Sequence, residues 1–156
     1  MYVRFDAAQA EPLIVSDRPD VTAKSIGLCD RDVCEIFVAP NVNEPRRYFD
    51  FEVAPSVEWL DVALDLTSGE RNSDWEYSSG METFAEIGPD CVVMTMKIPW
   101  NAFGRPGPKT GDVWLGNLFR CVGEGVGRGN LAWQPTLTVD PAFHVPERFG
   151  ENCFVK

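Results

Sequence analysis

One carboxylate, Glu35, lies inside a run of β-forming residues at positions 33–39. An unpaired charge is costly to bury, so a glutamate in such a strand needs a partner or contact with water. Two interpretations stay open. Glu35 either faces solvent or forms an ion pair on an edge strand, or it lies on the exposed face of a sheet that binds a polar ligand.

Two aspartates, Asp30 and Asp32, alternate in the polar turn that leads into this run. Hard oxygen ligands in a loop suit calcium, so we predict both as calcium ligands, with a solvated turn as the alternative. The five cysteines lack the spacing of a zinc site and are expected to be free thiols.

Tryptophans suggest a class of ligand. Proteins hold neutral sugars by stacking the C–H face of the sugar on an aromatic ring, while Asn, Glu or Arg side chains bond the hydroxyls. Trp133 follows Asn130 closely at an expected loop-to-strand junction, so both side chains can reach one ligand. The alternative is that Trp133 packs in the core.

Catalytic machinery is not evident. His144 is the only histidine and has no serine or cysteine nucleophile motif beside it, so a structural hydrogen-bonding role is expected. The glycine-rich stretch 123–129 follows an expected strand but precedes no helix, which excludes a dinucleotide fingerprint. Spacing alone identifies no glycosidase pair. We predict a non-enzyme, with a glycosidase as an alternative.

Composition limits the partners. The chain has 156 residues, 44% of them hydrophobic, and a formal net charge of −10. This suits one globular domain with its own core, which we expect to span residues 1–156. An acidic surface disfavours nucleic acids and anionic membranes and suits neutral ligands or divalent cations. No apolar run approaches the ~20 residues of a membrane-spanning helix. Without a visible leader the chain is expected to be cytoplasmic, or secreted or periplasmic if a leader is missing.

Alternation of apolar and polar residues predicts most of the strands. It occurs at 2–7, 48–53, 59–66, 92–98 and 113–122. Each such strand is expected to have one core face and one wet face. Turn-rich connectors separate them, and helical periodicity is missing apart from one short turn at 99–104. The pattern predicts an all-β fold, an antiparallel β-sandwich with immunoglobulin- or jelly-roll-like layers.

Six segments, in order along nearly the whole chain, resemble the family 9 carbohydrate-binding modules and their relatives. They are DRDVCEIFVAP at 30–40, YFDFEVAP at 48–55, MKIPWNAFG at 96–104, GDVWLGNLFR at 111–120, AWQP at 132–135 and FHVPERFG at 143–150.

The resemblance implies a non-catalytic sandwich that binds xylan- or cellulose-type sugars, notably chain ends. By motif position, Glu35, Asn130 and Trp133 match the family's polar and stacking residues, and Cys29 stands where the first stacking tryptophan would be. Structural calcium is known in the family. The family also usually has N-terminal strands that this chain lacks, which suggests a fragment or a shortened variant.

Two alternatives remain from other functional classes. The first is a haem-binding domain of the related sandwich superfamily, with Met94, Met96 or His144 as axial ligands. The alternation places both methionines on a core face, which favours packing over ligation. The second is a degenerate sandwich without a sugar site, kept for protein contacts.

Overall fold

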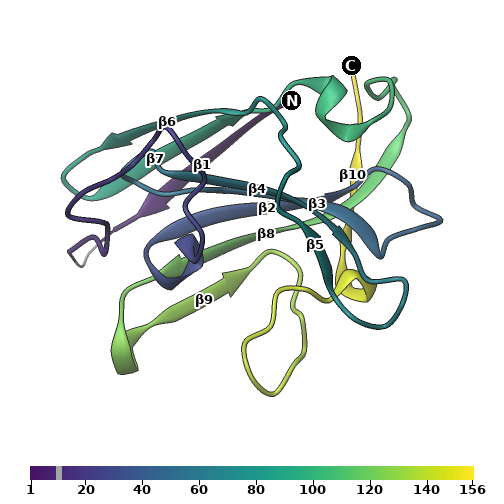
Figure 1. Ribbon diagram of the computed structural model, residues 1–156. Coiled ribbons are helices and arrows are strands. Elements are labelled where there is room, and N and C mark those ends of the chain that lie inside the picture. Colours follow the sequence, from purple (N-terminus) through teal and green to yellow (C-terminus); the bar gives the residue numbers. More distant parts are fainter. Residues whose placement is uncertain (10–11) are drawn as a thin grey trace.

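Two antiparallel β-sheets face each other in the computed structural model, which describes residues 1–9 and 12–156 (Figure 1). The smaller sheet has the order β1-β7-β6, and the larger has the order β10-β8-β2-β3-β4-β5 with β9 paired to β8. The strands are β1(Tyr2–Ala8), β2(Val33–Ala39), β3(Arg47–Val53), β4(Trp59–Asp65), β5(Asn72–Asp74), β6(Glu82–Ile87), β7(Cys91–Lys97), β8(Val113–Val122), β9(Gly129–Ala132) and β10(Gly150–Cys153). The predicted all-β sandwich is confirmed.

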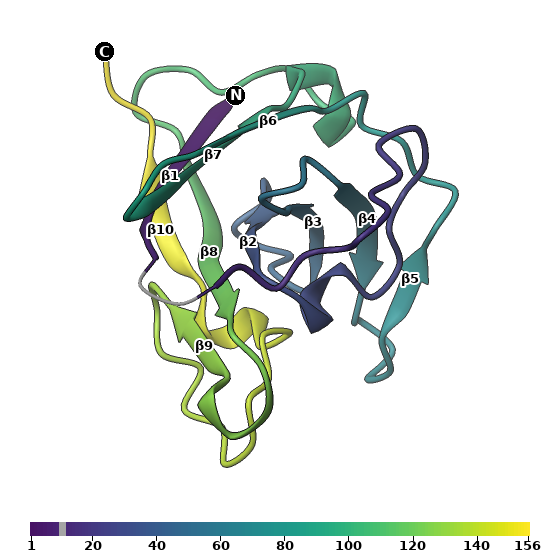
Figure 2. The same ribbon diagram turned by 90° about the vertical axis from the view of Figure 1, so that its left-hand side faces the viewer.

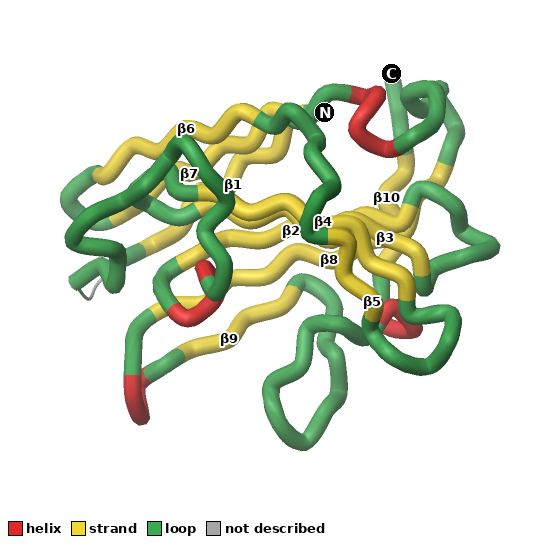
Figure 3. Tube along the Cα trace, in the orientation of Figure 1, coloured by secondary structure: helices red, strands yellow, loops and turns green. Residues whose placement is uncertain are grey.

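The helical elements are short 3-10 turns, drawn red in Figure 3. They are η1(Leu28–Asp30), η2(Trp100–Phe103), η3(Gly125–Gly127) and η4(Pro146–Arg148). The turn predicted at 99–104 is η2, which ends at Gly104 with φ 63°, a left-handed conformation that favours glycine.

The core between the two sheets follows the predicted alternation in β1, β3 and β7. In β4 the apolar face predicted as core lies instead on the outer face of the larger sheet. Phe51, Ile98 and Trp114 are almost fully buried there together with Met94 and Met96. These long apolar side chains remove a large area from water, which is the main favourable term in folding. The prediction that both methionines pack in the core is confirmed, with Met94 2% and Met96 0% exposed.

The outer face of the larger sheet is also buried, whereas the alternation predicts one wet face for each strand. All seven residues of β2 are buried. Segment 133–149 lies against this outer face, below the sheet in Figures 1 and 2. Leu28 of η1 packs against the same face, beside Val33 and Cys121. A second apolar cluster forms here, in which Phe149 packs against Phe37 and Phe143 packs against Phe119. Sequence periodicity cannot show this layer, because a loop without regular structure supplies it.

Two strands have no clear signature in the sequence. β6 is one of the two edges of the smaller sheet, and none of its residues is buried, so it shows little alternation of hydrophobicity. β5 has only three residues. The interpretation of Glu35 as a residue of an edge strand is wrong, because β2 is paired on both sides, with β3 and with β8.

Candidate functional site

Three carboxylates meet on the outer face of the larger sheet. In the antiparallel pair of β2 and β3, Glu35 lies opposite Glu52 and Phe37 lies opposite Asp50. Residues opposite each other in a sheet project from the same face, so this register gathers Glu35, Asp50 and Glu52. One carboxylate oxygen of each lies within 4.8 Å of the other two. The side chains are only 2%, 4% and 4% exposed, respectively. These three residues are the acidic triad below.

Burial and mutual repulsion favour protons on the acidic triad. Burial raises the pKa of Glu35 to about 7, opposed by the hydrogen bond from Cys121 and the positive charge of Arg128. Burial also raises the pKa of Asp50 and of Glu52 well above the usual range, and neighbouring negative charge adds to both effects. The environment therefore favours a bound proton or cation at the triad.

Two other buried carboxylates of the chain have cationic partners, and the triad does not. Glu58 pairs with Arg31 at 3.0 Å, and Asp61 pairs with Lys24 at 2.7 Å. Within residues 1–9 and 12–156, no ion pair includes a triad member. Asp50 Oδ1 and Glu52 Oε2 are buried without a hydrogen-bond partner. Buried polar atoms are rarely left unpaired, so the triad could hold a metal ion.

The acidic triad lines a pocket of about 470 Å³. We call it the acidic pocket; its other lining residues are Cys29, Asp30, Arg71, Cys121, Arg128, Asn130, Pro141, Ala142, Phe143 and His144. They come from η1, the β4–β5 connection, the β8–β9 hairpin and segment 141–144. Four parts of the chain that are separate in sequence thus converge on the acidic triad of β2 and β3.

Arg128 ties two of these loops together. Its guanidinium donates hydrogen bonds to the carbonyls of Asp30 at 3.1 Å and Gly123 at 3.0 Å, and also to the carbonyl of Cys29. The β8–β9 register pairs Asn130 with Cys121, and the Cys121 thiol donates to Glu35 Oε1 at 3.7 Å. Asn130 therefore projects from the face that carries the acidic triad.

Aromatic rings of segment 141–144 also line the acidic pocket. Phe143 stacks on Phe119 with ring centroids 4.2 Å apart, and His144 stacks on Phe37 at 5.0 Å. His144 Nδ1 shares a 2.7 Å hydrogen bond with the Tyr48 hydroxyl. Burial lowers the pKa of His144 to about 4, helped by the charge of Arg71. The ring is neutral near pH 7, in line with the structural role expected from the sequence.

The predicted site residues separate into two groups. Cys29, Glu35 and Asn130, together with Asp30, line the acidic pocket. Trp133 does not line it: its backbone N–H bonds to the Leu118 carbonyl, and its side chain borders a different surface, beside Leu131. Register places that surface on the other face of the larger sheet, so the structure does not bring Trp133 to Glu35.

The two predicted calcium ligands have different environments. Asp32 is buried, and its Oδ1 accepts a 2.7 Å hydrogen bond from the Gly123 N–H. Its other carboxylate oxygen, Oδ2, is buried without a partner. Asp30 is exposed at the rim of the acidic pocket. The pair as a calcium site stays a prediction.

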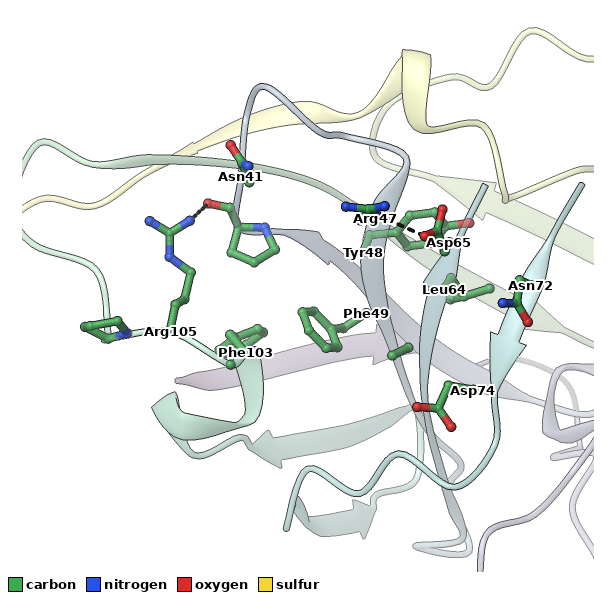
Figure 4. A pocket seen from close by; sticks show the side chains of 14 residues that line it. Asn41, Arg47, Tyr48, Phe49, Leu64, Asp65, Asn72, Asp74, Phe103 and Arg105 are labelled. Atoms are coloured by element: carbon green, nitrogen blue, oxygen red, sulfur yellow. Dashed lines mark hydrogen bonds and ion pairs between the residues drawn. The ribbon is translucent and has the colours of Figure 1, made fainter. Parts of the chain in front are cut away.

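A second cavity, of about 590 Å³, opens beside β3, β4 and β5 (Figure 4). Phe49 and Phe103 form its apolar part. Its charged groups already have partners: Arg47 bonds Asp65 at 3.0 Å, and Arg105 donates to the Pro40 carbonyl at 2.5 Å. Because these groups are satisfied and the triad is not, the acidic pocket is the stronger candidate for a polar ligand.

Asp50 and Glu52 were missed as site residues, although the alternation put them on one face of their strand. The missing information was the pairing of β2 with β3. Two neighbouring strands with acidic residues at alternate positions, joined by a short connection, are the signal that could have revealed the cluster.

Comparisons with known proteins show the fold and no family. No family model and no curated protein matches the chain. The chain is similar to the crystal structure of a "putative carbohydrate-binding protein" from Bacteroides uniformis, with a TM-score of 0.69 and 19% sequence identity. The alignment covers 96% of this chain and 69% of that one. Within the described residues, no helix has the length and hydropathy needed to cross a bilayer.

Proposed function

We propose that this chain is a non-catalytic carbohydrate-binding module whose ligand occupies the acidic pocket. The observation that carries the proposal is the convergence of Cys29, Glu35 and Asn130 on one cavity. The resemblance to family 9 modules singles out these three residues by motif position, together with Trp133, which borders the other face of the larger sheet. The similarity in fold to the Bacteroides uniformis protein, which bears a carbohydrate-binding description, supports the same class of function.

The chemistry of the pocket suits a neutral saccharide. Carboxylates accept hydrogen bonds from sugar hydroxyls, and the Asn130 amide can both donate and accept. Phe143 and His144 offer apolar surface for the C–H face of a sugar ring. The concentration of negative charge repels uronic acids and phosphosugars. From the resemblance, xylose- and glucose-type sugars are the first candidates.

The arrangement argues against a glycosidase. Glycosidases need two carboxyl groups whose surroundings drive their pKa values apart, one acid and one ionised partner. Here the pKa values of all three carboxyls move in the same direction, upward, chiefly because of burial. No carboxyl of the triad has the lowered pKa typical of a glycosidase nucleophile or base, so we expect binding without hydrolysis.

Calorimetric titration with xylobiose, cellobiose and glucose tests the proposal. Asn130→Ala should weaken binding by about tenfold or more, because it removes hydrogen bonds to the ligand worth about 1.5 kcal/mol. Leu131→Ala is the matched control: the neighbouring residue is exposed and borders the other face of the sheet. It should leave affinity unchanged.

Trp133→Ala distinguishes the two surfaces. Retained binding in this variant favours the acidic pocket, and lost binding moves the ligand to the face that carries Trp133. If none of the three sugars gives heat at millimolar concentration, and none shifts the melting temperature, the proposed function is wrong.

A further inference from the structure

Among the described residues, the acidic triad holds three buried carboxylates without an ion pair, whereas the buried carboxylates of Glu58 and Asp61 are each paired with a cationic side chain. Asp61, as deeply buried, is bonded by Lys24 and by the Ser79 N–H at 2.7 Å. Nothing equivalent reaches Asp50 Oδ1 or Glu52 Oε2. The two arginines that line the same pocket, Arg71 and Arg128, form no ion pair with the triad within residues 1–9 and 12–156.

The spacing of the triad fits one metal ion. Calcium binds oxygen ligands at about 2.3–2.6 Å. Two ligands on opposite sides of such an ion are therefore up to about 5 Å apart, and the three carboxylate oxygens lie within 4.8 Å of one another. The ligand atoms are carboxylate oxygens, which hard divalent cations prefer. The backbone of β2 and β3 fixes all three Cα positions, so little ordering is needed for binding.

We propose that Glu35, Asp50 and Glu52 bind one divalent cation of the calcium class, and that this ion takes part in holding the sugar. The second half rests on the proposed function; the first half does not. Calcium prefers six to eight oxygen ligands. Three carboxylates leave coordination positions that face the pocket, where water is replaced by two neighbouring hydroxyls of a saccharide.

A cation at the triad is consistent with the positions of Arg128 and Asn130. The ion neutralises charge that would otherwise repel in a low-dielectric site. Arg128 holds the rim by bonding the carbonyls of Asp30 and Gly123 and therefore leaves the triad to the ion. Asn130, on the same face as Cys121 and Glu35, is placed to bond a hydroxyl next to those on the metal.

Metal binding is tested first, without sugar, on chelator-treated full-length protein. Calcium, magnesium and manganese are each titrated by calorimetry, and the melting temperature is recorded with each metal. At about 100 times the dissociation constant, calcium should raise the melting temperature by about 5–10 °C. Asp50→Asn and Glu52→Gln should lose this response. Glu86→Gln is the control, an exposed acid on β6 in the smaller sheet and outside the acidic pocket, and should keep it.

Folding of the variants is checked in chelator. Asp50→Asn and Glu52→Gln remove like-charge repulsion, so each should melt at or above the temperature of the metal-free parent. If no metal changes the melting temperature or gives heat at millimolar concentration, the metal site is refuted. An equal calcium response in Asp50→Asn and the parent also refutes it, because the ion then binds elsewhere.

Sugar binding is then measured with calcium and with chelator. At least tenfold weaker binding in chelator supports the ion as part of the sugar site. Equal affinity in both conditions overturns that role, while leaving the proposed carbohydrate function standing. Metal binding without any sugar binding supports the cation site and counts against the proposed function alone.

Discussion

The buried ion pair between Lys24 and Asp61 gives the sharpest test of how this fold is held together. Asp61 is 1% exposed and lies on the face of β4 that packs toward the smaller sheet, opposite Phe51. Its carboxylate meets Lys24 Nζ at 2.7 Å and accepts from the Ser79 N–H at 2.7 Å and the Ser79 hydroxyl at 2.5 Å. Lys24 also donates to the Asp61 carbonyl at 2.7 Å. Two connecting segments are thereby fixed to one strand.

Replacing Asp61 by asparagine leaves the Lys24 ammonium, which is only 19% exposed, without its counter-ion. Breaking a buried ion pair in this way costs about 3–5 kcal/mol, so Asp61→Asn should lower the free energy of unfolding by about that amount. For a chain of this size the melting temperature should fall by roughly 10 °C. The matched control is Asp6→Asn, which breaks the Arg4–Asp6 pair on the surface, where both side chains are more than half exposed. Its effect should stay within about 1 kcal/mol.

A double-mutant cycle with Lys24→Met isolates the pairwise part. Because the two side chains touch, the double variant should lose about 1–3 kcal/mol less than the sum of the single losses. Urea unfolding followed by tryptophan fluorescence measures all four proteins. If Asp61→Asn costs no more than Asp6→Asn, or if the cycle is additive, the claim that this pair anchors the two segments is refuted.

Three further outcomes follow from individual residues. Gly116→Ala should lower the free energy of unfolding by at least about 3 kcal/mol, because a Cβ there would lie 2.3 Å from the Phe37 carbonyl oxygen. Urea unfolding measures this, and an unchanged free energy would mean that β8 and β2 do not pair as described. The pKa of Glu35 is about 7 in the folded chain, against an ordinary value of 4.5. In chelator, the stability that protonated Glu35 contributes should therefore be complete below pH 4.5 and lost as pH rises through 7, a loss of about 3 kcal/mol. Urea unfolding should show the difference in free energy of unfolding between Glu35→Gln and the parent changing by this amount between about pH 4.5 and 8; a constant difference would disprove the raised pKa. Cys29→Trp should tighten sugar binding by about tenfold in calorimetry, because it adds a stacking ring at the pocket; unchanged affinity would place the ligand away from Cys29.

Sequence patterns sufficed for the sandwich and for most of its strands. Alternation in β3 and β7 is strong because one face of each strand packs between the sheets, as Phe51 and Met94 do. β8 begins and ends at the predicted residues, since its run from Val113 to Val122 alternates throughout. The edge strand β6 gave no such pattern, because none of its residues is buried.

Some residues of the candidate site could be predicted from the sequence, and others could not. Glu35 and Asn130 were found from sequence, because each has an unusual type for its place or matches a family motif. Asp50 and Glu52 looked like the wet face of a strand, and Trp133 looked like a neighbour of Asn130. Only tertiary structure could show otherwise, because strand pairing decides which residues share a face, and the loop at 133–149 decides whether that face meets water.

The amino-acid order alone determined that an all-β sandwich would form and which side chains of β1, β3 and β7 would fill the space between its sheets, since those are consequences of local periodicity. It did not determine which face of β4 points between the sheets, because its apolar side chains lie on the outer face of the larger sheet. It did not determine the second buried layer, or the meeting of Glu35 with Asp50 and Glu52. Those depend on register and on chain segments far apart in sequence. The physical reason is that burial of a charge is a property of everything around it, while periodicity describes only the strand that carries it.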